Sequence, residues 1–250
     1  MQDEVITEVR DHVLVITINR PAAKNAIDSA VAEGLVDALV QLDAKEDLFV
    51  GVVTGAGGAF SSGMDLKAFS GSGVPRALDT LFREGSKKPL IAAVEGFALA
   101  GGLEVALVCD LIVAARGAKL GIPETRVGLF AAGGGLFRLA RRLPYGVAME
   151  MAVTASPITA EVAHEHGLVS RITEPGEALS TALDLAERIA RNAPLAVAAS
   201  KELIRESAGR TETEAWDLQT PHMRTVFRSA DAKEGPRAFA EKRAPRWSGA

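Results

Sequence analysis

The feature that most constrains the fold is one apolar stretch, Pro89–Ala115, the most hydrophobic part of the chain. Its length raises the question of a membrane-spanning helix, but it contains Glu95, Glu104 and Asp110 together with three glycines. Acidic side chains at the depth of a bilayer are costly. The stretch also divides naturally into a strand, a glycine turn and a helix. We therefore expect it to form the buried core of a soluble protein that resides in the cytoplasm.

Strand-like runs that alternate with helix-like runs predict an α/β fold with a largely parallel sheet and right-handed crossovers. The predicted strands are Val13–Asn19, Phe49–Thr54, Leu90–Val94 and Leu111–Ala115. Their nearly continuous apolar sequences are typical of strands buried on both faces. Asp28 is positioned to cap the first helix, and Gly101 with Gly102 opens a later one.

After residue 133 the chain is predicted to be mostly helical. The predicted helices are Leu136–Leu143, Ala148–Val153, Ala160–His166, Glu177–Arg191, Pro194–Ser207, Glu212–Arg228 and Lys233–Lys242, with one extended piece at Leu168–Ile172. We divide the chain into a core domain, residues 1–195, which holds the functional site, and a helical C-terminal region, residues 196–250. This second region is expected to pack on the core or on a neighbouring subunit.

Charge and cysteine content restrict the partners. The formal net charge is −4, so no sequence-wide basic field exists to hold nucleic acid or an anionic membrane. Cys109 is the single cysteine, which excludes an internal disulfide and fits a reducing compartment. His164 and His166 would point to different faces of a helix, so we expect no metal site. Residues 1–12 are polar and acidic, unlike a signal peptide.

Two glycine-containing segments could present backbone N–H groups to a ligand. In the first, residues 59–67, small residues precede Gly63 and allow close backbone approach. In the second, residues 96–104, Gly101 and Gly102 open a helix whose first N–H groups are unpaired. Two such donors on one oxygen would form an oxyanion hole, in which each donor is worth about 3–4 kcal/mol. The alternative is that these glycines serve only turns and tight packing.

Two carboxylates are candidates for acid–base chemistry. Glu104 lies one turn into the predicted helix among apolar residues, so its side chain has no solvated face to occupy. Glu124 follows twenty positions later, after a predicted extended run. The alternative is structural: each glutamate would pair with an arginine such as Arg126.

Several short segments, ordered along nearly the whole chain, resemble those of the crotonase superfamily, the enoyl-CoA hydratase/isomerase family. They are Asn19-Arg20-Pro21 with Lys24-Asn25-Ala26, Phe60–Leu66, Lys88–Gly96, Gly101–Glu104, Cys109-Asp110, Pro123-Glu124, Val127-Gly128-Leu129, Gly133-Gly134-Gly135, Ala163 with Gly167-Leu168-Val169, and Phe239–Pro245. Each segment alone is a weak signal, whereas their order and spacing together are highly specific.

The resemblance implies a fold and a reaction. The fold would be a crotonase-type spiral of ββα units followed by a helical C-terminal trimerisation region. The N–H groups of Met64 and Gly101 would form the oxyanion hole for a thioester oxygen. Glu104 would activate water for attack at the β-carbon, and Glu124 would supply a proton at the α-carbon. The implied activity is hydration of a 2-enoyl-CoA in fatty acid or other lipid metabolism.

The resemblance also implies how the substrate is held. The residues carried over as contacts to the coenzyme A part are Lys24, Ser62, Asp65, Leu66, Lys67, Phe239 and Lys242. Phe239 and Lys242 would reach the site from an adjacent subunit, with Lys242 near the phosphates and Lys24 a second candidate for them. A homotrimer or a dimer of trimers is implied. No cofactor is expected beyond the coenzyme A that the substrate carries.

Two departures from the family pattern concern the acyl pocket. Leu136 and Phe137 replace polar residues after the glycine loop, which could reshape that pocket. The stretch between Asp65 and Lys88 is short and contains Gly71, Gly73 and Pro75, so the sequence does not predict the acyl chain length.

Other activities stay open at this point. Double-bond isomerisation and dehydration of a specialised 3-hydroxyacyl-CoA use the same enolate chemistry as hydration. A paralogue that binds acyl-CoA without turnover is a further alternative, although it would not need both glutamates. A hydrolase or decarboxylase is less favoured, because no distinctive nucleophile or carboxylate clamp stands out. Binding of RNA conflicts with the acidic charge and the few aromatic residues.

Overall fold

The computed structural model describes residues 3–250, and its centre is a six-stranded sheet in the order β1-β2-β3-β4-β6-β9. The strands are β1 (Val5–Arg10), β2 (Val13–Ile18), β3 (Val50–Gly55), β4 (Leu90–Val94), β6 (Leu111–Ala115) and β9 (Arg171–Thr173). Strand β1 pairs antiparallel with β2, and all the other neighbours in this sheet are parallel. The prediction of a largely parallel sheet is confirmed.

The four strands expected from the sequence are present, two of them with the predicted bounds. Strand β1 was not predicted, because it is an exposed edge strand whose charged residues give it no continuous apolar run. It forms a hairpin with β2 through Asp11, which has a positive φ of 50°. The extended piece expected at Leu168–Ile172 is displaced toward the C-terminus and becomes β9.

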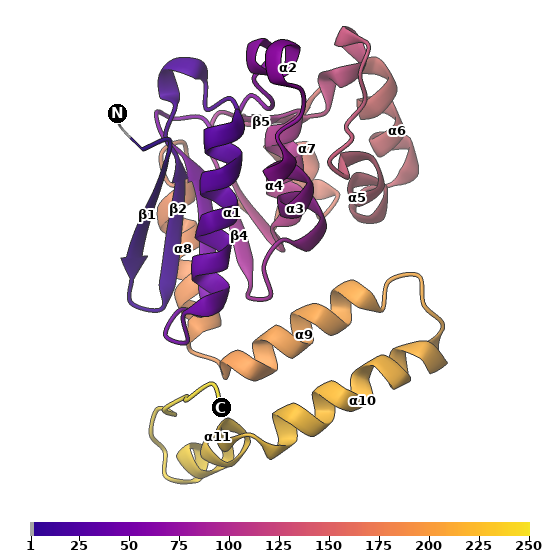
Figure 1. Ribbon diagram of the computed structural model, residues 1–250. Coiled ribbons are helices and arrows are strands. Elements are labelled where there is room, and N and C mark those ends of the chain that lie inside the picture. The colour runs from indigo at the N-terminus through magenta and orange to yellow at the C-terminus, as the bar shows by residue number, and fades with distance from the viewer. Residues whose placement is uncertain (1–2) are drawn as a thin grey trace.

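Helices cover both faces of the sheet, as Figure 1 shows. On one face lie α1 (Ser29–Ala44), α3 (Arg76–Glu84) and α4 (Gly101–Val108), and on the other lies α8 (Ala178–Ala190). Side chains of β4 alternate between the two faces: Ala92 packs on the first side and Ile91 on the second. This two-sided burial explains why β4 and β6 are apolar at every position.

Asp28 caps α1 as predicted, since its carboxylate accepts a hydrogen bond from Val31 N at 3.0 Å.

A smaller sheet gives the fold its spiral form. It contains β5 (Phe97–Leu99), β7 (Lys119–Gly121) and β8 (Ile158–Thr159). Each long strand β4 and β6 is followed by a short strand of this second sheet and then by a helix, so the chain repeats a ββα unit. Two isolated bridges, Ser61 with Ala98 and Ile27 with Met64, continue the second layer beyond β5.

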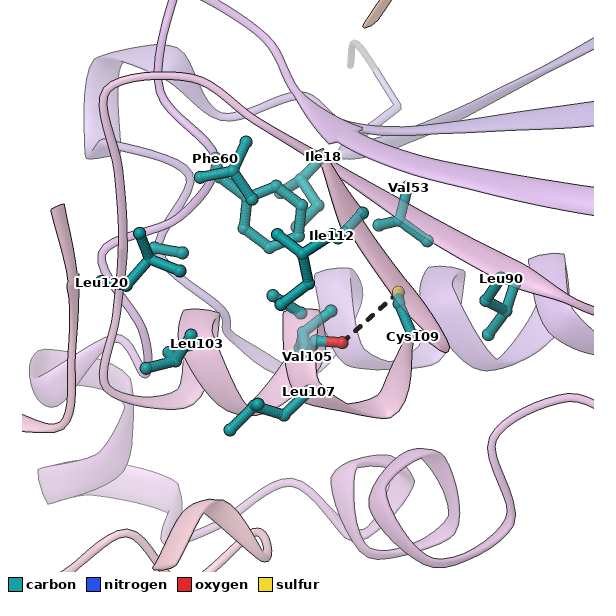
Figure 2. Packing of buried hydrophobic residues seen from close by; sticks show 14 of the residues in the cluster. Ile18, Val53, Phe60, Leu90, Leu103, Val105, Leu107, Cys109, Ile112 and Leu120 are labelled. Atoms are coloured by element: carbon teal, nitrogen blue, oxygen red, sulfur yellow. Dashed lines mark hydrogen bonds between the residues drawn. The ribbon is translucent and has the colours of Figure 1, made fainter. Parts of the chain in front are cut away.

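Helix α4 lies in the centre of the core, where Figure 2 shows its side chains among residues of β2, β3, β4 and β6. Leu103, Val105 and Leu107 are almost fully buried, as is Cys109 immediately after the helix. The Cys109 Sγ–H donates to Val105 O at 3.6 Å. Because α4 is enclosed on all sides, any charged group that it carries must point into a cavity or find partners within the protein.

Two helices, α2 (Leu66–Ser72) and α3, occupy the stretch between Asp65 and Lys88, where no element was predicted. Helix α2 begins at Asp65, which caps it, and α3 follows Pro75 and ends at Gly85. Leu78 and Leu81 of α3 are buried against α1 and α4. Their helical spacing was present in the sequence and would have predicted this helix.

The remaining helices follow the predicted order. They are α5 (Gly135–Arg142), α6 (Tyr145–Thr154), α7 (Ala160–Glu165), α9 (Pro194–Glu206), α10 (Glu212–Arg228) and α11 (Ala230–Ala240). Helix α10 has the predicted bounds, and the others are shifted at one or both ends. Figure 1 shows α9, α10 and α11 extending from the end of α8 as a separate layer beneath the sheet. We call this layer the C-terminal arm.

The C-terminal arm contacts the core through Lys201 of α9. Its Nζ lies 2.8 Å from a carboxylate oxygen of Asp110 and donates to Lys88 O at 2.8 Å. Helix α10 has no buried residue, and it leaves Trp216 and Phe227 exposed. Among the helices of residues 3–250, none is long and apolar enough to cross a membrane.

Candidate active site

A cavity of about 300 Å³ opens where the second strand layer meets the start of α4. Its walls come from the loop before α2, from α3, from the start of α4, and from the short 3-10 helix η2 (Pro123–Val127) with the loop after it. The lining residues are Ile27, Ser62, Met64, Leu66, Val74, Leu78, Phe82, Ala100, Gly101, Glu104, Pro123, Glu124, Arg126, Val127, Leu129, Phe130, Ala132 and Gly133. We call it the catalytic cavity.

Two backbone N–H groups meet at one side of the catalytic cavity. A Cβ added at Gly101 would lie 3.5 Å from Met64 N, and a Cβ added at Gly63 would lie 2.9 Å from Gly101 N. Neither the Met64 N–H nor the Gly101 N–H donates to an acceptor within residues 3–250. Gly101 opens α4, where N–H groups have no partner inside the helix. Two unpaired donors side by side can stabilise negative charge on one oxygen.

The sequence holds these two segments together with small residues. Ile27 N donates to Gly63 O at 2.8 Å, and Asp65 N donates to Ile27 O at 2.9 Å. A Cβ at Gly102 would lie 2.6 Å from Ser61 O, so any larger residue there would push α4 away from the loop. The glycines are therefore needed for close packing as well as for an exposed backbone. The two roles that the sequence analysis treated as alternatives occur together.

Ala100 has a positive φ of 50° with ψ of −130° at the start of α4. This region of backbone space is costly for a residue with a Cβ. Such strain persists only where surrounding contacts enforce it, and Ala100 N donates to Gly121 O at 2.9 Å. The strained residue immediately precedes the Gly101 amide.

Glu104 points from the first turn of α4 into the catalytic cavity, and only 4% of it is exposed. Burial raises the pKa of its carboxyl, whereas hydrogen bonds from the Gly135 and Gly133 amides and the charge of Arg138 oppose this shift. Gly135 N donates to Glu104 Oε1 at 2.9 Å. These donors favour the ionised form, so Glu104 is suited to accept a proton.

Glu124 faces the same cavity from η2. Burial raises its pKa to about 7, and the nearby charge of Glu104 adds to this shift. Its Oε2 is buried without a hydrogen-bond partner in the described part of the chain. A buried carboxyl with one oxygen left without a donor, near a second carboxylate, favours the protonated form, so Glu124 is suited to donate a proton.

The alternative in which the glutamates pair with arginines is wrong. No ion pair of Glu104 or Glu124 occurs among residues 3–250. Arg126 lines the catalytic cavity, but its side chain makes no hydrogen bond to either carboxylate there. Spacing in the sequence could not settle this, because a long side chain can turn in several directions.

The structure brings six of the predicted site residues into one cavity: Ser62, Met64, Leu66, Gly101, Glu104 and Glu124. Lys24 lies beside it, since Ser62 N donates to Lys24 O at 3.0 Å and the lysine side chain is exposed. Lys67 is exposed in the first turn of α2.

Like Lys24 and Lys67, the other three predicted residues, Asp65, Phe239 and Lys242, do not line the catalytic cavity. Asp65 caps α2, accepting from Lys67 N at 3.1 Å, and it faces Arg20 at 3.4 Å, so its carboxylate already has partners. Phe239 and Lys242 are exposed at the end of α11, in the C-terminal arm and far from α2 in Figure 1. Their contact with coenzyme A from another subunit stays a prediction.

The expected effect of Leu136 and Phe137 on the acyl pocket stays a prediction, because these residues lie away from the catalytic cavity. Neither residue lines the catalytic cavity. Phe137 is 55% exposed, and Arg138 Cζ lies over its ring, 5.4 Å from the ring centroid. Leu136 lines a separate cavity on the other side of η2.

Arg138 and Phe82 were missed by the sequence analysis. Arg138 Nη1 donates to Gly133 O at 2.8 Å, and Arg138 Nη2 donates to Phe82 O at the end of α3. The arginine thereby fixes the glycine loop that holds Glu104. Its place one turn into α5, following three glycines, was a signal that could have been noticed. Within residues 3–250, no group of acidic, histidine and cysteine side chains is arranged to hold a metal ion.

The fold is shared with solved structures over the full chain. An enoyl-CoA hydratase from Mycobacterium tuberculosis H37Rv superposes with a TM-score of 0.95 at 52% identity, with 100% of both chains covered. A probable enoyl-CoA hydratase/isomerase from Mycobacterium abscessus gives the same TM-score, 0.95, at 53% identity and full coverage. The protein therefore has the crotonase-type α/β fold that the sequence resemblance implied.

Sequence comparison identifies the family. The enoyl-CoA hydratase/isomerase family matches residues 8–250. A curated relative, an enoyl-CoA hydratase from Mycobacterium tuberculosis, is 44% identical over 97% of this chain and 95% of its own length. A carnitinyl-CoA dehydratase from Salmonella arizonae is 39% identical over 95% of each chain. The chain belongs to the enoyl-CoA hydratase/isomerase family, within the crotonase superfamily, and is an enzyme.

Proposed function

We propose that this enzyme is an enoyl-CoA hydratase that adds water across the 2,3 double bond of a 2-enoyl-CoA thioester. One observation carries the proposal: Glu104 and Glu124 lie in the same cavity as two unpaired amides. Glu104 accepts a hydrogen bond from a backbone amide, whereas Glu124 Oε2 has no partner in the described part of the chain. Hydration needs one group to accept a proton from water and another to deliver a proton to carbon.

In the proposed reaction, the amides of Met64 and Gly101 bind the thioester oxygen. Glu104 takes a proton from water while the water oxygen forms a bond to the β-carbon. The electrons of the double bond move to the thioester, whose oxygen gains negative charge that the two amides stabilise. Glu124 then gives its proton to the α-carbon. Afterwards Glu104 loses the proton that it took from water and Glu124 regains one, so that Glu104 is again ionised and Glu124 again protonated. One water molecule is consumed in each turnover.

The coenzyme A part is proposed to leave the cavity past Ser62, Leu66 and Lys67. Lys24 is exposed beside this path and is proposed to meet the phosphates. Lys242 and Phe239 would complete the binding site from a neighbouring subunit of a trimer or of a dimer of trimers. The exposed aromatic residues of the C-terminal arm support assembly, since Phe239 is 88% exposed. No cofactor beyond the coenzyme A of the substrate is proposed, and the protein would act in the cytoplasm.

Dehydration of a specialised 3-hydroxyacyl-CoA is the second candidate, favoured by the 39% identity to a carnitinyl-CoA dehydratase. It is the reverse of the same steps and uses the same two carboxyls. Isomerisation of an enoyl-CoA would need only one proton shuttle, so the second carboxyl favours hydration over it.

The test is hydration of crotonyl-CoA and longer 2-enoyl-CoAs, followed by loss of the conjugated thioester absorbance. We expect turnover that falls by about 10²-fold or more in Glu104→Gln and in Glu124→Gln, with coenzyme A binding largely retained. Absence of turnover at every chain length, with measurable acyl-CoA binding, would favour the isomerase or the non-catalytic paralogue. Full activity in both variants would refute the assignment of the two carboxyls.

A further inference from the structure

Helix α3 forms one wall of the catalytic cavity, and the last carbonyls at its C-terminal end have no partner inside the helix. Phe82 O accepts a hydrogen bond from Arg138 Nη2 of α5. Glu84 O accepts one from Arg205 of α9 at 3.4 Å. The helix dipole favours cations at this end. The end of α3 is therefore an anchor for arginine side chains that come from other parts of the chain.

The guanidinium of Arg138 also reaches the glycine loop, residues 133–135. Its Nη1 donates to Gly133 O at 2.8 Å while its Nη2 donates to Phe82 O. A Cβ added at Gly134 would collide with Nη1, so the guanidinium lies directly against the loop. A planar guanidinium with donors on two terminal nitrogens can hold two carbonyls in one fixed arrangement. Arg138 thus ties the glycine loop to the end of α3.

The glycine loop in turn holds the Glu104 carboxylate. Gly135 N donates to Glu104 Oε1 at 2.9 Å, and a Cβ added at Gly133 would lie 2.8 Å from Oε2. Three consecutive glycines have more backbone freedom than any other tripeptide, and Gly134 has a positive φ of 97°. A loop of this composition keeps one conformation only where other contacts fix it. The tie to α3 supplies such a contact.

Glu104 and Arg138 also interact through their charges. Burial raises the pKa of the Glu104 carboxyl, whereas hydrogen bonds from the glycine loop and the charge of Arg138 oppose this shift. Burial lowers the pKa of the Arg138 guanidinium and the charge of Arg142 adds to this, whereas the charge of Glu104 opposes it. The two opposite charges therefore stabilise each other. The other charged side chains that line the catalytic cavity, or the cavity of about 580 Å³ that Arg138 lines, are Glu124 and Arg126 of η2, Arg83 and Glu84 of α3, Asp110 after α4, Arg141 of α5, and Lys201 and Arg205 of α9.

We propose that Arg138 is a positioning residue for Glu104, because it ties the glycine loop to the end of α3 and so keeps the Gly135 amide on the carboxylate that accepts the proton of water. The inference rests on the proposed function, since it concerns the step in which Glu104 acts as a base. Arg138 does not line the catalytic cavity, so it acts through the loop and through its charge and not by contact with the substrate.

The experiment compares two substitutions of Arg138 with one matched control. Arg138→Gln removes the charge and shortens the side chain. Arg138→Lys keeps the charge but has one nitrogen in place of the two that bridge the carbonyls. Arg141→Gln is the control, since it removes the same charge from an exposed position of the same helix whose side chain does not bond the glycine loop. Folding of each variant is checked by circular dichroism and thermal unfolding.

The measured quantities are kcat, KM and the pH dependence of kcat/KM for crotonyl-CoA. A displaced carboxylate should lower kcat about 10-fold to 100-fold in Arg138→Gln and to a smaller extent in Arg138→Lys. KM should stay within about threefold, because uniform binding of the substrate is not removed. The acidic limb of the pH profile should move to higher pH in Arg138→Gln, since Glu104 loses a charge that favours its ionised form. Arg138→Lys keeps that charge and should keep the limb in place.

The control Arg141→Gln should match the wild type in all three quantities. A full kcat in folded Arg138→Gln would overturn the inference, as would an equal loss in Arg141→Gln. A lower kcat in Arg138→Gln with an unmoved acidic limb would also overturn it, because general damage to the structure would then explain the loss. If Arg138→Gln does not fold, Arg138→Lys decides: a lower kcat with KM retained supports the inference, and a full kcat overturns it.

Infrared titration of the carboxyl groups without substrate separates this inference from the proposed function. The band that is absent in Glu104→Gln identifies Glu104, and it should titrate at higher pH in Arg138→Gln than in the wild type. A wild-type protein without hydratase activity would refute the proposed function, whereas this shift would still support the tie between Arg138 and Glu104. An unshifted band in Arg138→Gln would overturn the tie even in an active enzyme.

Discussion

Substitution of Gly135 by alanine tests whether the position of Glu104 controls turnover. Gly135 opens α5, and its N–H donates to Glu104 Oε1. An added Cβ would lie 3.1 Å from both Glu104 Cγ and Oε1 and 3.0 Å from Ala131 Cβ. These distances are tighter than ordinary contacts, so the carboxylate has to yield. Gly135 has no positive φ, so alanine introduces no backbone strain of its own.

The magnitude follows from the size of the displacement. A misplacement of 1 Å in a catalytic group costs on the order of 10²-fold in rate. A shift of ~0.3–0.5 Å is enough to relieve the contact, which scales to a loss of roughly four- to tenfold in kcat. We expect KM to change little, because the glycine does not line the path of coenzyme A. Alanine also favours the helix over glycine by up to ~1 kcal/mol, which offsets part of the crowding.

The assay is steady-state hydration of crotonyl-CoA by Gly135→Ala, with Gly146→Ala as the matched control. Gly146 lies in the first turn of α6, and a Cβ added there meets nothing within 4 Å. The control should keep its kcat and gain about 0.4–1 kcal/mol in the free energy of unfolding. Equal kcat values for Gly135→Ala and the wild type would refute the claim that this hydrogen bond positions Glu104.

Three further outcomes are expected. If Glu124 is the proposed acid, with a pKa of about 7, kcat/KM should decline as pH rises through 7; its raised pKa also means that folding stability falls between pH 4.5 and 7, and Glu124→Gln should remove that slope in urea titrations. Ala100→Gly should stabilise the fold by about 1 kcal/mol, because the strain relieved exceeds the entropy lost by glycine; a lower Tm would contradict this. Lys201→Met should cost about 1–3 kcal/mol in denaturant unfolding, since Asp110 loses its partner; an unchanged midpoint would show that the C-terminal arm is held by other contacts.

Much of the core could be predicted because its signals are local. The strands β4 and β6 have the predicted bounds, and the burial of Glu104 followed from the apolar residues on every side of it. The opening of α4 at Gly101 followed from helix capping chemistry. In each case a short stretch of sequence contains the whole physical reason.

What could not be predicted depends on distant residues. Arg138 lies between Gly133 and Phe82, which are far apart in the sequence, so only the folded chain reveals that it fixes the glycine loop. The absence of an arginine partner for Glu124 in the described structure likewise depends on side-chain direction. The boundary between core and C-terminal region at residue 195 stays a prediction, as do the contacts of Phe239 and Lys242, because these contacts were expected to come from a neighbouring subunit.

Helix α4 supplies the Gly101 amide and the Glu104 carboxyl within one enclosed turn, whereas Glu124 lies on the short 3-10 helix η2 and Phe130 on the exposed loop that follows it. Mutations in the helix would damage folding and chemistry together, whereas changes at the exposed loop positions, Phe130 among them, leave the core intact. Substitutions at the exposed loop positions are therefore expected to change the lining of the catalytic cavity without removing the Gly101 amide or the Glu104 carboxyl. A library directed at residues 127–130 and 132 would vary the cavity wall while the residues supplied by α4 stay constant.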